Sequence, residues 1–237
     1  MLNIRICVPC KDKTFLIDNT EFKVESKKLE DENIAKINVS LFPDNKLTLT
    51  EFGNKMIEES KNEYDYLILM HSDVNLSIYD FVKHLILTNG KYNVVGMAGT
   101  KKLFVSQTPL TWFTGSHKYP NERYGKIVHN HDGLLLESFF NKDNPEVLDT
   151  EVITIDGLLM CLDKKTMLND KARFDEIFTY DFYDLDFCLN IQFNTDLKIG
   201  VFVQQTIHQS LGKSVLTEEY LVPERKFREK YQKQFNS

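Results

Sequence analysis

The chain has 237 residues, enough for one substantial domain with a full core, and its 42% hydrophobic composition is typical of a globular protein. Its 35 acidic and 29 basic residues give a formal net charge of -6, which argues against a general nucleic-acid binder but permits a locally basic site for a nucleotide phosphate. No segment approaches the roughly 20 apolar residues that span a bilayer, and no signal-type start is present, so we expect a cytoplasmic protein.

Apolar runs and helical patterns alternate along most of the chain. Strand-like runs occupy residues 4–8, 34–39, 66–70, 93–98 and 198–203, and helical periodicity covers residues 49–61, 78–89 and 184–194. This alternation is typical of an α/β fold with a mostly parallel central sheet flanked by helices. Because no repeat or low-complexity linker divides the chain, we predict a single domain over residues 1–237.

A Cys-x-x-Cys pair, Cys7 and Cys10, closes the first predicted strand. Such a pair serves either as a redox-active dithiol or as half of a zinc site. Neither pattern is complete, because a thioredoxin-like motif opens a helix directly and a zinc site needs a second pair. Four cysteines in a chain of this length also do not form a disulfide framework, so a redox role is disfavoured.

The third apolar strand, at residues 66–70, ends directly in His71, and Asp73 follows two residues later. In open α/β sheets, ligands bind just beyond the carboxyl ends of the strands. Residues two apart on an extended chain point to the same side, so His71 and Asp73 can face one divalent ion or one phosphate group. Alternatively, Asp73 caps the next helix. Ser77 and Asp80 have capping-box spacing and form a better cap, which leaves Asp73 without a structural role.

Between Thr100 and Asp149 the regular pattern breaks into short segments rich in Gly, Asn, His and aromatic residues. A long irregular stretch within an otherwise regular domain is typical of a binding loop or lid. We therefore predict an irregular functional insertion here rather than a further repeat of helix and strand.

Two carboxylates, Asp184 and Asp186, stand at the start of the helix predicted over residues 184–194, after an aromatic and acidic run. Two interpretations are open. Acids at a helix start interact favourably with the helix dipole, by about 0.3–1 kcal/mol each. Alternatively, a carboxylate held against aromatic rings is partly desolvated, which raises its proton affinity and suits it to general-base catalysis.

The C-terminal region contributes one further candidate ligand. His208 follows the strand predicted at residues 198–203 and can reach a site from a mobile C-terminal segment, although a lone histidine is more often structural. The Gly-Lys-Ser sequence at residues 212–214 does not complete a phosphate-binding P-loop, because Ile207 occupies the place of the first glycine.

Residues 223–235 read as a helix that begins at Pro223 and carries Phe227 and Tyr231 on one side of a basic surface. This helix can pack its aromatic side chains onto the domain, or it can make a peripheral contact with the inner face of an anionic membrane. The narrow apolar face favours packing onto the domain.

Taken in order, these segments resemble the family 2 type of glycosyltransferases with the Rossmann-like GT-A fold, particularly the small bacterial branch in which His-x-Asp-Val replaces Asp-x-Asp. The resemblance spans most of the chain. It comprises Val8-Pro9, the helix at 50–57, His71-Ser72-Asp73-Val74, the strand and glycine turn at 94–99, the Asp-Gly strand at 155–160 and the block at 183–189. The order and spacing of these motifs are more specific than any single one.

The resemblance implies a metal-dependent, inverting transfer of a sugar from a nucleotide-sugar donor to an acceptor hydroxyl. It implies that His71 and Asp73 bind the metal and that His208 is similar to the histidine that closes the metal site. The cofactor is then Mn²⁺ or Mg²⁺, because oxygen ligands suit Mg²⁺ and the imidazoles favour Mn²⁺. The metal stabilises the departing diphosphate.

The block at residues 183–189 looks like the family motif that carries the catalytic base, which implies that Asp184 is this base. Tyr183 stands where many relatives have Glu, so Asp186 remains the alternative base.

The resemblance also implies contacts with the donor. The nucleotide contacts are Pro9 and Asn54, and the contacts with the sugar are Gly96, Gly99, Asp156 and Gly157.

By the same resemblance, residues 1–100 form the nucleotide-binding half and residues 101–237 the acceptor and catalytic half. Planar aromatic rings stack on the apolar faces of sugars, so Trp112 and Phe113, with the segment to Asp132, are either an acceptor wall or part of the core. A glycan, a lipid-linked saccharide and a protein are all compatible as acceptors.

Two other functions stay open. A non-catalytic nucleotide-sugar or glycan-binding module of the same fold should have lost the base or the metal ligands, and both are present here. A sugar-nucleotide pyrophosphorylase needs a glycine-rich phosphate loop after the first strand, and residues 9–13 contain no glycine.

Overall fold

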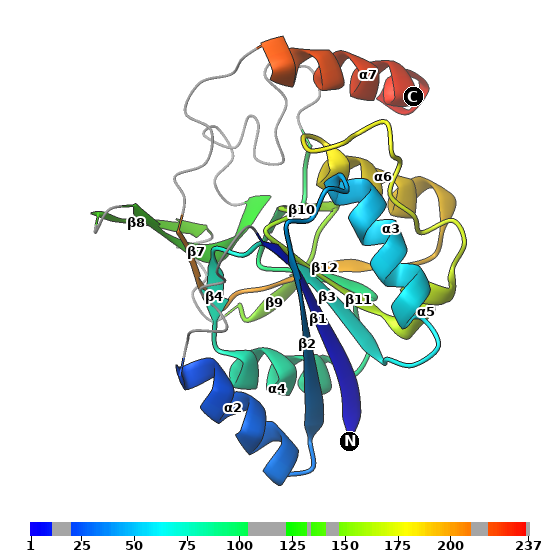
Figure 1. Ribbon diagram of the computed structural model, residues 1–237. Coiled ribbons are helices and arrows are strands. Elements are labelled where there is room, and N and C mark those ends of the chain that lie inside the picture. Colours follow the sequence, from blue (N-terminus) through cyan, green and yellow to red (C-terminus); the bar gives the residue numbers. More distant parts are fainter. Residues whose placement is uncertain (11–19, 104–121, 132–133, 141–146, 210–217, 236–237) are drawn as a thin grey trace.

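A computed structural model describes residues 1–10, 20–103, 122–131, 134–140, 147–209 and 218–235 (Figure 1). A seven-stranded sheet lies at its centre, in the order β2-β1-β3-β11-β5-β12-β9. Its strands are β1 (Leu2–Cys10), β2 (Ala35–Pro43), β3 (Tyr66–Met70), β5 (Val94–Gly96), β9 (Asp149–Glu151), β11 (Leu159–Asp163) and β12 (Ile199–Phe202).

This central sheet is mixed. β1 pairs in parallel with β2 and β3, and β12 pairs in parallel with β5. In contrast, β11 runs antiparallel to β3 and β5, and β9 runs antiparallel to β12. The predicted α/β class is confirmed, but the predicted mostly parallel sheet is wrong. A strand buried on both faces reads as a continuous apolar run whichever way it points, so its direction cannot be read from the sequence.

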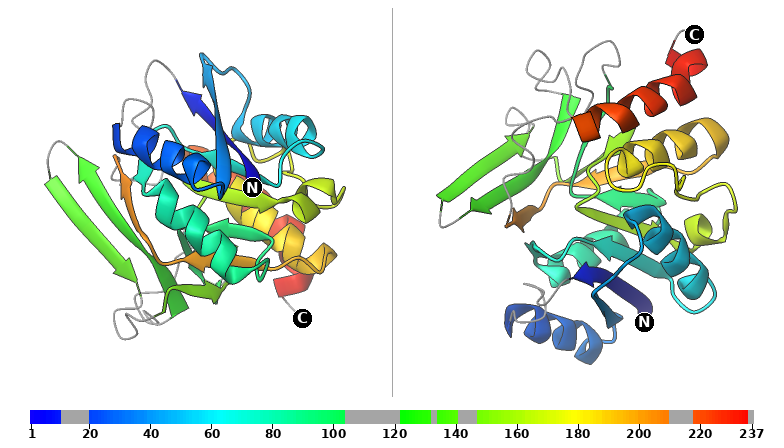
Figure 2. Two further views of the ribbon diagram at one scale, coloured as in Figure 1. Left: turned by 90° about the horizontal axis from the view of Figure 1, so that it is seen from below. Right: turned by 45° about the horizontal axis from the view of Figure 1, so that its top comes forward.

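Six strands form a second sheet, in the order β10-β6-β7-β13-β4, with β8 paired to β7. Its strands are β4 (Val74–Leu76), β6 (Ala98–Thr100), β7 (Arg123–His131), β8 (Leu134–Phe140), β10 (Thr154–Ile155) and β13 (Gln205–His208). The antiparallel hairpin of β7 and β8 projects from the body of the protein (Figure 2). For this described part the predicted irregular insertion is wrong, because pairing with neighbouring strands overrides weak local strand propensity.

The strand predicted at residues 93–98 is divided between the two sheets, as β5 and β6. Gly96 and Gly99 lie inside these buried strands, so the expected glycine turn is absent. A Cβ on Gly96 would lie 2.7 Å from the Ile155 side chain, and one on Gly99 would collide with the backbone oxygen of Thr154. Both glycines therefore permit close packing against the segment that precedes β11.

Helices cover both faces of the central sheet. They are α2 (Thr20–Asp31), α3 (Leu49–Ser60), α4 (Ile78–Thr88), α5 (Lys164–Leu168) and α6 (Tyr183–Asn194), while α7 (Glu218–Phe235) packs on α6. Alternating residues of β1 face opposite sides, so Ile4 and Ile6 pack in the cluster with α2 and α4. Cys7 packs in the cluster with α3, α5 and α6 on the other face.

Local capping fixes where the helices of the first half begin. The Thr48 hydroxyl accepts the backbone N–H of Glu51, and the Glu51 carboxylate accepts the backbone N–H of Thr48, a complete capping box for α3. At α4, the Ser77 side chain accepts the backbone N–H of Asp80, so the predicted cap is confirmed. Asp73 lies outside this cap.

The C-terminal helix α7 already includes Glu218, so the prediction that it begins at Pro223 is wrong. Pro223 lies past the first turn and cannot donate a hydrogen bond to the carbonyl four residues before it, but the preceding turn is held by burial of Tyr220, whose ring lies 5.1 Å from that of Phe182. Phe227 and Tyr231 are buried against α6, as the packing interpretation predicted. Among the helices described, none is long and apolar enough to cross a membrane.

Gly53→Ala in α3 should lower the free energy of unfolding by about 1–2 kcal/mol, although alanine gains roughly 1 kcal/mol in helix propensity. A Cβ at this position would lie 2.6 Å from the Phe174 ring, which stacks on Phe187 with centroids 4.3 Å apart. Urea unfolding followed by circular dichroism measures the change. In a Phe174→Leu background the same substitution should be neutral or stabilising, and an equal loss in both backgrounds would contradict the packing argument.

Candidate functional site

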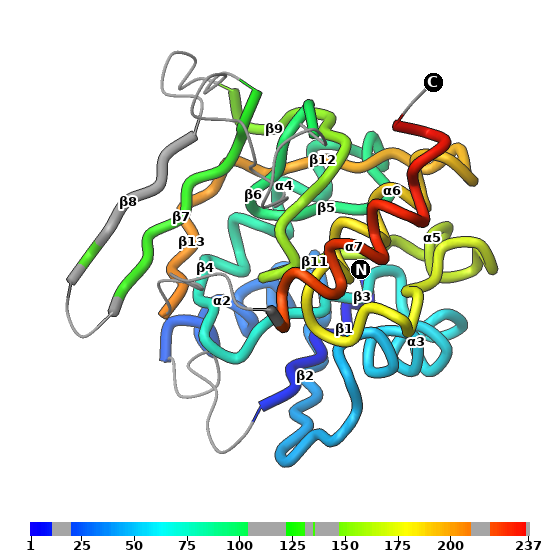
Figure 3. The backbone as a smooth tube through the Cα atoms, turned by 90° about the horizontal axis from the view of Figure 1, so that it is seen from above, coloured from blue at the N-terminus to red at the C-terminus, as the bar shows by residue number. Residues whose placement is uncertain are grey.

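The candidate site lies at the carboxyl end of β3, where two loops meet. His71 follows β3 directly, and its backbone N–H donates to the Leu158 carbonyl at 3.0 Å. Antiparallel pairing of β3 with β11 brings Met70 opposite Leu159, so residues 156–158 lie beside His71. Seen from above, α7 passes over β11 on the same side of the protein (Figure 3).

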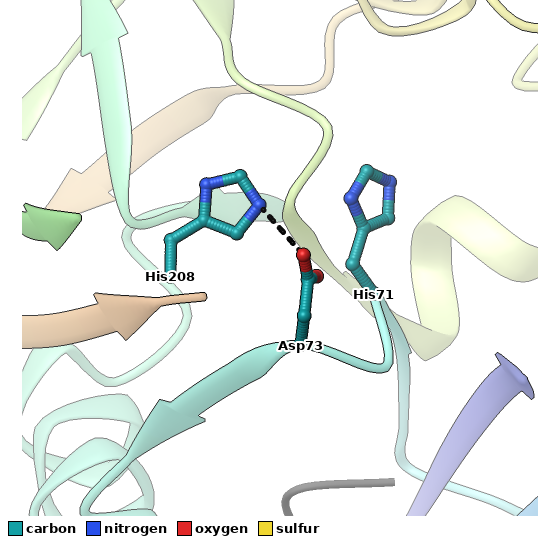
Figure 4. Close-up of side chains that lie close together, drawn as sticks. All are labelled: His71, Asp73 and His208. Atoms are coloured by element: carbon teal, nitrogen blue, oxygen red, sulfur yellow. Dashed lines mark ion pairs between the residues drawn. The ribbon is translucent and has the colours of Figure 1, made fainter. Parts of the chain in front are cut away.

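The three predicted metal ligands lie together (Figure 4). His71 and Asp73 come from the connection between β3 and β4. His208 comes from β13, which is antiparallel to β4 and places His208 opposite Val74. The expectation that His208 reaches the site from a mobile segment is therefore wrong, since a strand carries it.

One ligand atom from each of His71, Asp73 and His208 lies within 4.8 Å of the others. His208 Nε2 is 3.4 Å from Asp73 Oδ2. Two imidazole nitrogens and one carboxylate oxygen that converge in this way suit a divalent ion such as Mn²⁺. These residues thus form a possible metal-binding group.

The side chain of Tyr183 determines which nitrogen of His71 is available. The Tyr183 hydroxyl donates its proton to the Gly157 carbonyl at 2.9 Å and lies 3.1 Å from His71 Nε2. Because the tyrosine proton is already used, Nε2 of His71 must carry a proton and donate it. Nδ1 then keeps its lone pair, and this second nitrogen faces Asp73 and His208 (Figure 4).

Burial and the neighbouring charges set the protonation of this group. Burial lowers the pKa of His71, so its ring stays neutral as a metal ligand must. Burial, the largest single effect, would raise the pKa of Asp73, but the hydrogen bond with His208 and the charges of His208 and His71 together outweigh it and lower that pKa. Burial, the largest single effect, would lower the pKa of His208, but the hydrogen bond to Asp73 and the charges of Asp73 and Asp156 together outweigh it and raise that pKa.

Asp184, in the first turn of α6, is half-buried beside the same loop. Its Oδ2 accepts the backbone N–H of Gly157 at 2.9 Å, and its Oδ1 accepts that of Leu185 at 2.8 Å. Burial and the nearby charge of Asp156 raise the pKa of Asp184 to about 7, against the opposing effect of the two N–H donors. Asp184 borders a pocket of about 190 Å³ that also reaches His71.

Asp186 faces the opposite way, into the interface between α6 and α7. Its Oδ1 accepts hydrogen bonds from Lys230 at 2.6 Å and from the Tyr231 hydroxyl at 2.9 Å. Lys230 also contacts Asp175 at 2.7 Å. Burial raises the pKa of Asp186 despite the Lys230 charge, and its side chain is fully buried. This geometry ties the C-terminal helix to α6.

The implied donor contacts fall into two groups. Pro9 and Gly157 line a narrow apolar pocket together with His71, and Asp156 borders the pocket at Asp184. The Asn54 amide instead holds Phe174 in place: its Nδ2 donates to the Phe174 carbonyl, and its Oδ1 accepts the Phe174 N–H, both at 2.9 Å.

The implied sugar contacts Gly96 and Gly99 are buried within strands, and neither is among the described residues that line these two pockets. Trp112 and Phe113, the candidate acceptor wall, lie outside the described residues, as does the Gly-Lys-Ser sequence at 212–214.

The two cysteines of the Cys-x-x-Cys pair both lie in β1. Cys7 and Cys10 are free and buried, and burial raises the pKa of the Cys7 thiol to about 12. A thiol that is protonated at neutral pH is a poor nucleophile.

Two residues contribute to the site although no sequence motif indicated them. In the sequence, Tyr183 stood out only because many relatives have Glu at its position. Its contact with His71 joins residues that are 112 positions apart, so no local pattern could indicate it. Tyr220 lines the pocket at Asp184 from α7. The sequence around Tyr220 did not indicate this role, because the position of Tyr220 depends on how α7 packs.

Comparison with known proteins identifies the family of this chain. Residues 35–231 match the family described as "Glycosyltransferase like family". No curated protein matches the chain.

Three solved structures are similar to the chain. A197 from STIV is 11% identical with a TM-score of 0.44, covering 92% of this chain and 98% of A197. TarS 1-349 from S. aureus is 11% identical with a TM-score of 0.45, and the match covers 88% of this chain and 60% of the TarS chain. HddC from Yersinia pseudotuberculosis, complexed with GMP-PN, is 12% identical with a TM-score of 0.38, and the match covers 96% of this chain and 100% of the HddC chain. Similarity at this level does not determine an activity.

Tyr183→Phe should weaken Mn²⁺ binding about tenfold or more, because it removes the oxygen that orients the His71 ring. Calorimetric titration with MnCl₂ measures the affinity. Tyr64→Phe, a tyrosine packed near Arg5 and away from the site, is the control and should bind as the unmodified protein does. Unchanged affinity in Tyr183→Phe, with binding lost in Asp73→Asn, would refute the orienting role.

Lys230→Met should destabilise the fold by about 2 kcal/mol, less than the roughly 3–5 kcal/mol for breaking a fully buried ion pair, because the Lys230 side chain keeps 31% exposure. The Asp186 carboxylate then lacks its cation, so its folded-state pKa rises further above 3.8 and the loss should grow as pH rises from about 4 to 8. Lys233→Met, at an exposed position of the same helix, is the control. A loss independent of pH would contradict this account.

Proposed function

Because the chain belongs to the glycosyltransferase-like family, we propose that it transfers a sugar from a nucleotide-sugar to an acceptor hydroxyl on a GT-A fold, with inversion at the anomeric carbon. The observation that carries this proposal is one loop that contacts both functional groups. Gly157 donates its N–H to Asp184, and its carbonyl accepts the Tyr183 hydroxyl that meets His71. A candidate base and a candidate metal group thus border one pocket.

In this proposal His71, Asp73 and His208 hold Mn²⁺ or Mg²⁺, and their two imidazoles favour Mn²⁺. The metal, when bound, neutralises charge that develops on the departing diphosphate. Tyr183 keeps the His71 ring in the orientation that offers Nδ1. Pro9 and Gly157 border the side on which the nucleotide lies, and Asp156 is placed to contact the transferred sugar.

Asp184 acts as the general base on the acceptor hydroxyl. A carboxylate whose pKa is raised to about 7 has enough proton affinity to accept this proton, and it is substantially ionised near neutral pH. Its two backbone N–H donors hold it in a single orientation. Attack from the face opposite the departing diphosphate inverts the anomeric configuration, as in other displacements assisted by one base.

The surroundings favour Asp184 over Asp186 for this role. Asp186 is fully buried, and one of its oxygens is engaged by Lys230 and Tyr231, so an acceptor hydroxyl has no path to it among the described residues. Asp184 borders the pocket that reaches His71. Asp186 then serves to hold α7 against α6.

A panel of nucleotide-sugars tests the proposal without knowledge of the acceptor, because water can replace the acceptor hydroxyl. With Mn²⁺, one donor class should release its nucleoside diphosphate, and that release should stop when a chelator removes the metal. Thermal shifts on the same panel should rise with that donor only when Mn²⁺ is present. No release and no shift with any donor, in a folded sample, would refute the proposal.

Asp184→Asn should lower kcat with the active donor by about 10² to 10⁴-fold while the KM for the donor changes little, since a base acts mainly in the transition state. The rate of the unmodified enzyme should rise with pH through about 7, because ionisation of Asp184 creates the base. The variant should lack this rise. Asp196→Asn, at an exposed position two residues after the end of the same helix, is the control. Full activity in Asp184→Asn would refute the assignment.

A further inference from the structure

We infer that Tyr180 and Tyr220 form an acceptor subsite beside Asp184 and that this subsite takes an uncharged sugar ring. The inference rests on the proposed function of the same site and names its acceptor class. It begins from the pocket of about 190 Å³, which is lined by Leu49, His71, Asp156, Gly157, Tyr180, Asp181, Phe182, Tyr183, Asp184, Leu185 and Tyr220. This volume is below the range of roughly 300–1,000 Å³ for drug-sized ligands, so it suits one small ring.

Two tyrosines border this pocket from different elements. Tyr180 lies in the segment before α6 and keeps 58% of its surface exposed. Tyr220 comes from α7 and is buried. The charge of Asp184 contributes to the raised pKa of Tyr220, after the larger effect of burial, so this phenol lies near the base. Aromatic side chains with a polar tip provide a flat apolar face and a hydrogen-bonding group, which suits the two kinds of surface on a sugar.

The charge of the pocket selects against anionic acceptors. Asp156, Asp181 and Asp184 all border it, and among the described residues that line it there is no lysine or arginine. Juxtaposed like charges weaken binding strongly in a partly desolvated site. A phosphate or carboxylate on the acceptor ring would meet these carboxylates, whereas the hydroxyls of a neutral sugar can donate hydrogen bonds to them.

The wall that carries Tyr180 is held rigidly. Phe182, two residues away, has φ +68°, a left-handed conformation that is strained for a bulky residue. Its buried ring lies 5.1 Å from Tyr220 and 5.2 Å from Phe227, so packing against α7 offsets the strain. A subsite that is rigid before binding loses less entropy when a ligand arrives.

Saturation-transfer NMR with the full chain tests the subsite without a donor. The probes are methyl β-glucoside, methyl β-galactoside and N-acetylglucosamine, with glucuronate, galacturonate and N-acetylglucosamine 6-phosphate as their respective anionic counterparts. At least one neutral probe should bind, and its anionic counterpart should bind at least about fivefold more weakly. No binding by any neutral probe, or equal binding by the anionic ones, would overturn the inference.

Variants then locate the binding. Tyr180→Ala should weaken the neutral probe about fivefold to tenfold, and Tyr180→Phe should stay within about twofold because the ring face remains. Ile177→Ala, which removes another exposed apolar side chain of the same segment, is the matched control and should have no effect. If Tyr180→Ala fails to fold, Tyr180→Leu replaces it. Unchanged binding in the variant without the ring would overturn the inference.

The outcome separates this inference from the proposed function. Metal-dependent release of nucleoside diphosphate from a donor, with no sugar binding at Tyr180, leaves the transferase proposal standing and removes the subsite. Sugar binding at Tyr180 with no release from any donor upholds a neutral-sugar site but refutes its role as the acceptor site of a transferase.

Discussion

The site depends on the peptide at Gly157. Its N–H binds the Asp184 carboxylate and its carbonyl accepts the Tyr183 hydroxyl, which in turn meets His71. A Cβ at this residue would collide with the Tyr183 hydroxyl, so only glycine at this position lets Tyr183 keep its place. One backbone unit without a side chain therefore fixes the distance between the candidate base and the candidate metal group, and the antiparallel pairing of β3 with β11 holds that unit in place.

The C-terminal helix is part of this arrangement although its residues are far away in sequence. Asp186, two residues after Asp184, is buried and engages Lys230 and Tyr231 of α7. Removing such an ion pair from water costs free energy, and the second carboxylate oxygen of Asp186, Oδ2, has no hydrogen-bond partner among the described residues. The same interface buries the strained Phe182. Both features hold the first turn of α6, which carries Asp184, in one orientation, and this is a form of preorganisation.

Charge is distributed unevenly around the site. On one side, two histidines and Asp73 converge in a geometry that suits a divalent cation and, with it, an anionic diphosphate. On the other side, Asp156, Asp181 and Asp184 border the pocket and favour a neutral partner. In the proposed function, this asymmetry would keep an anionic donor and an uncharged acceptor in separate places while their reacting atoms meet.

The amino-acid sequence alone determined the α/β class, the strand at Tyr66–Met70 with His71 and Asp73 at its end, and the Ser77 cap. These features depend on local patterns, namely apolar runs, spacing along an extended chain and capping chemistry. The sequence left open whether Asp184 or Asp186 faces a pocket, because both stand in the first turn of one helix. The predictions of a mostly parallel sheet and of an irregular segment where β7 and β8 form a hairpin were wrong.

Only the tertiary structure decided these points, because each depends on a contact between distant parts of the chain. The pairing of β13 with β4 brings His208 to Asp73, and the packing of α7 gives Asp186 a structural partner. Tyr183 acquired its role only through its position against His71. Local sequence specifies which groups can do chemistry, and long-range packing specifies which of them meet.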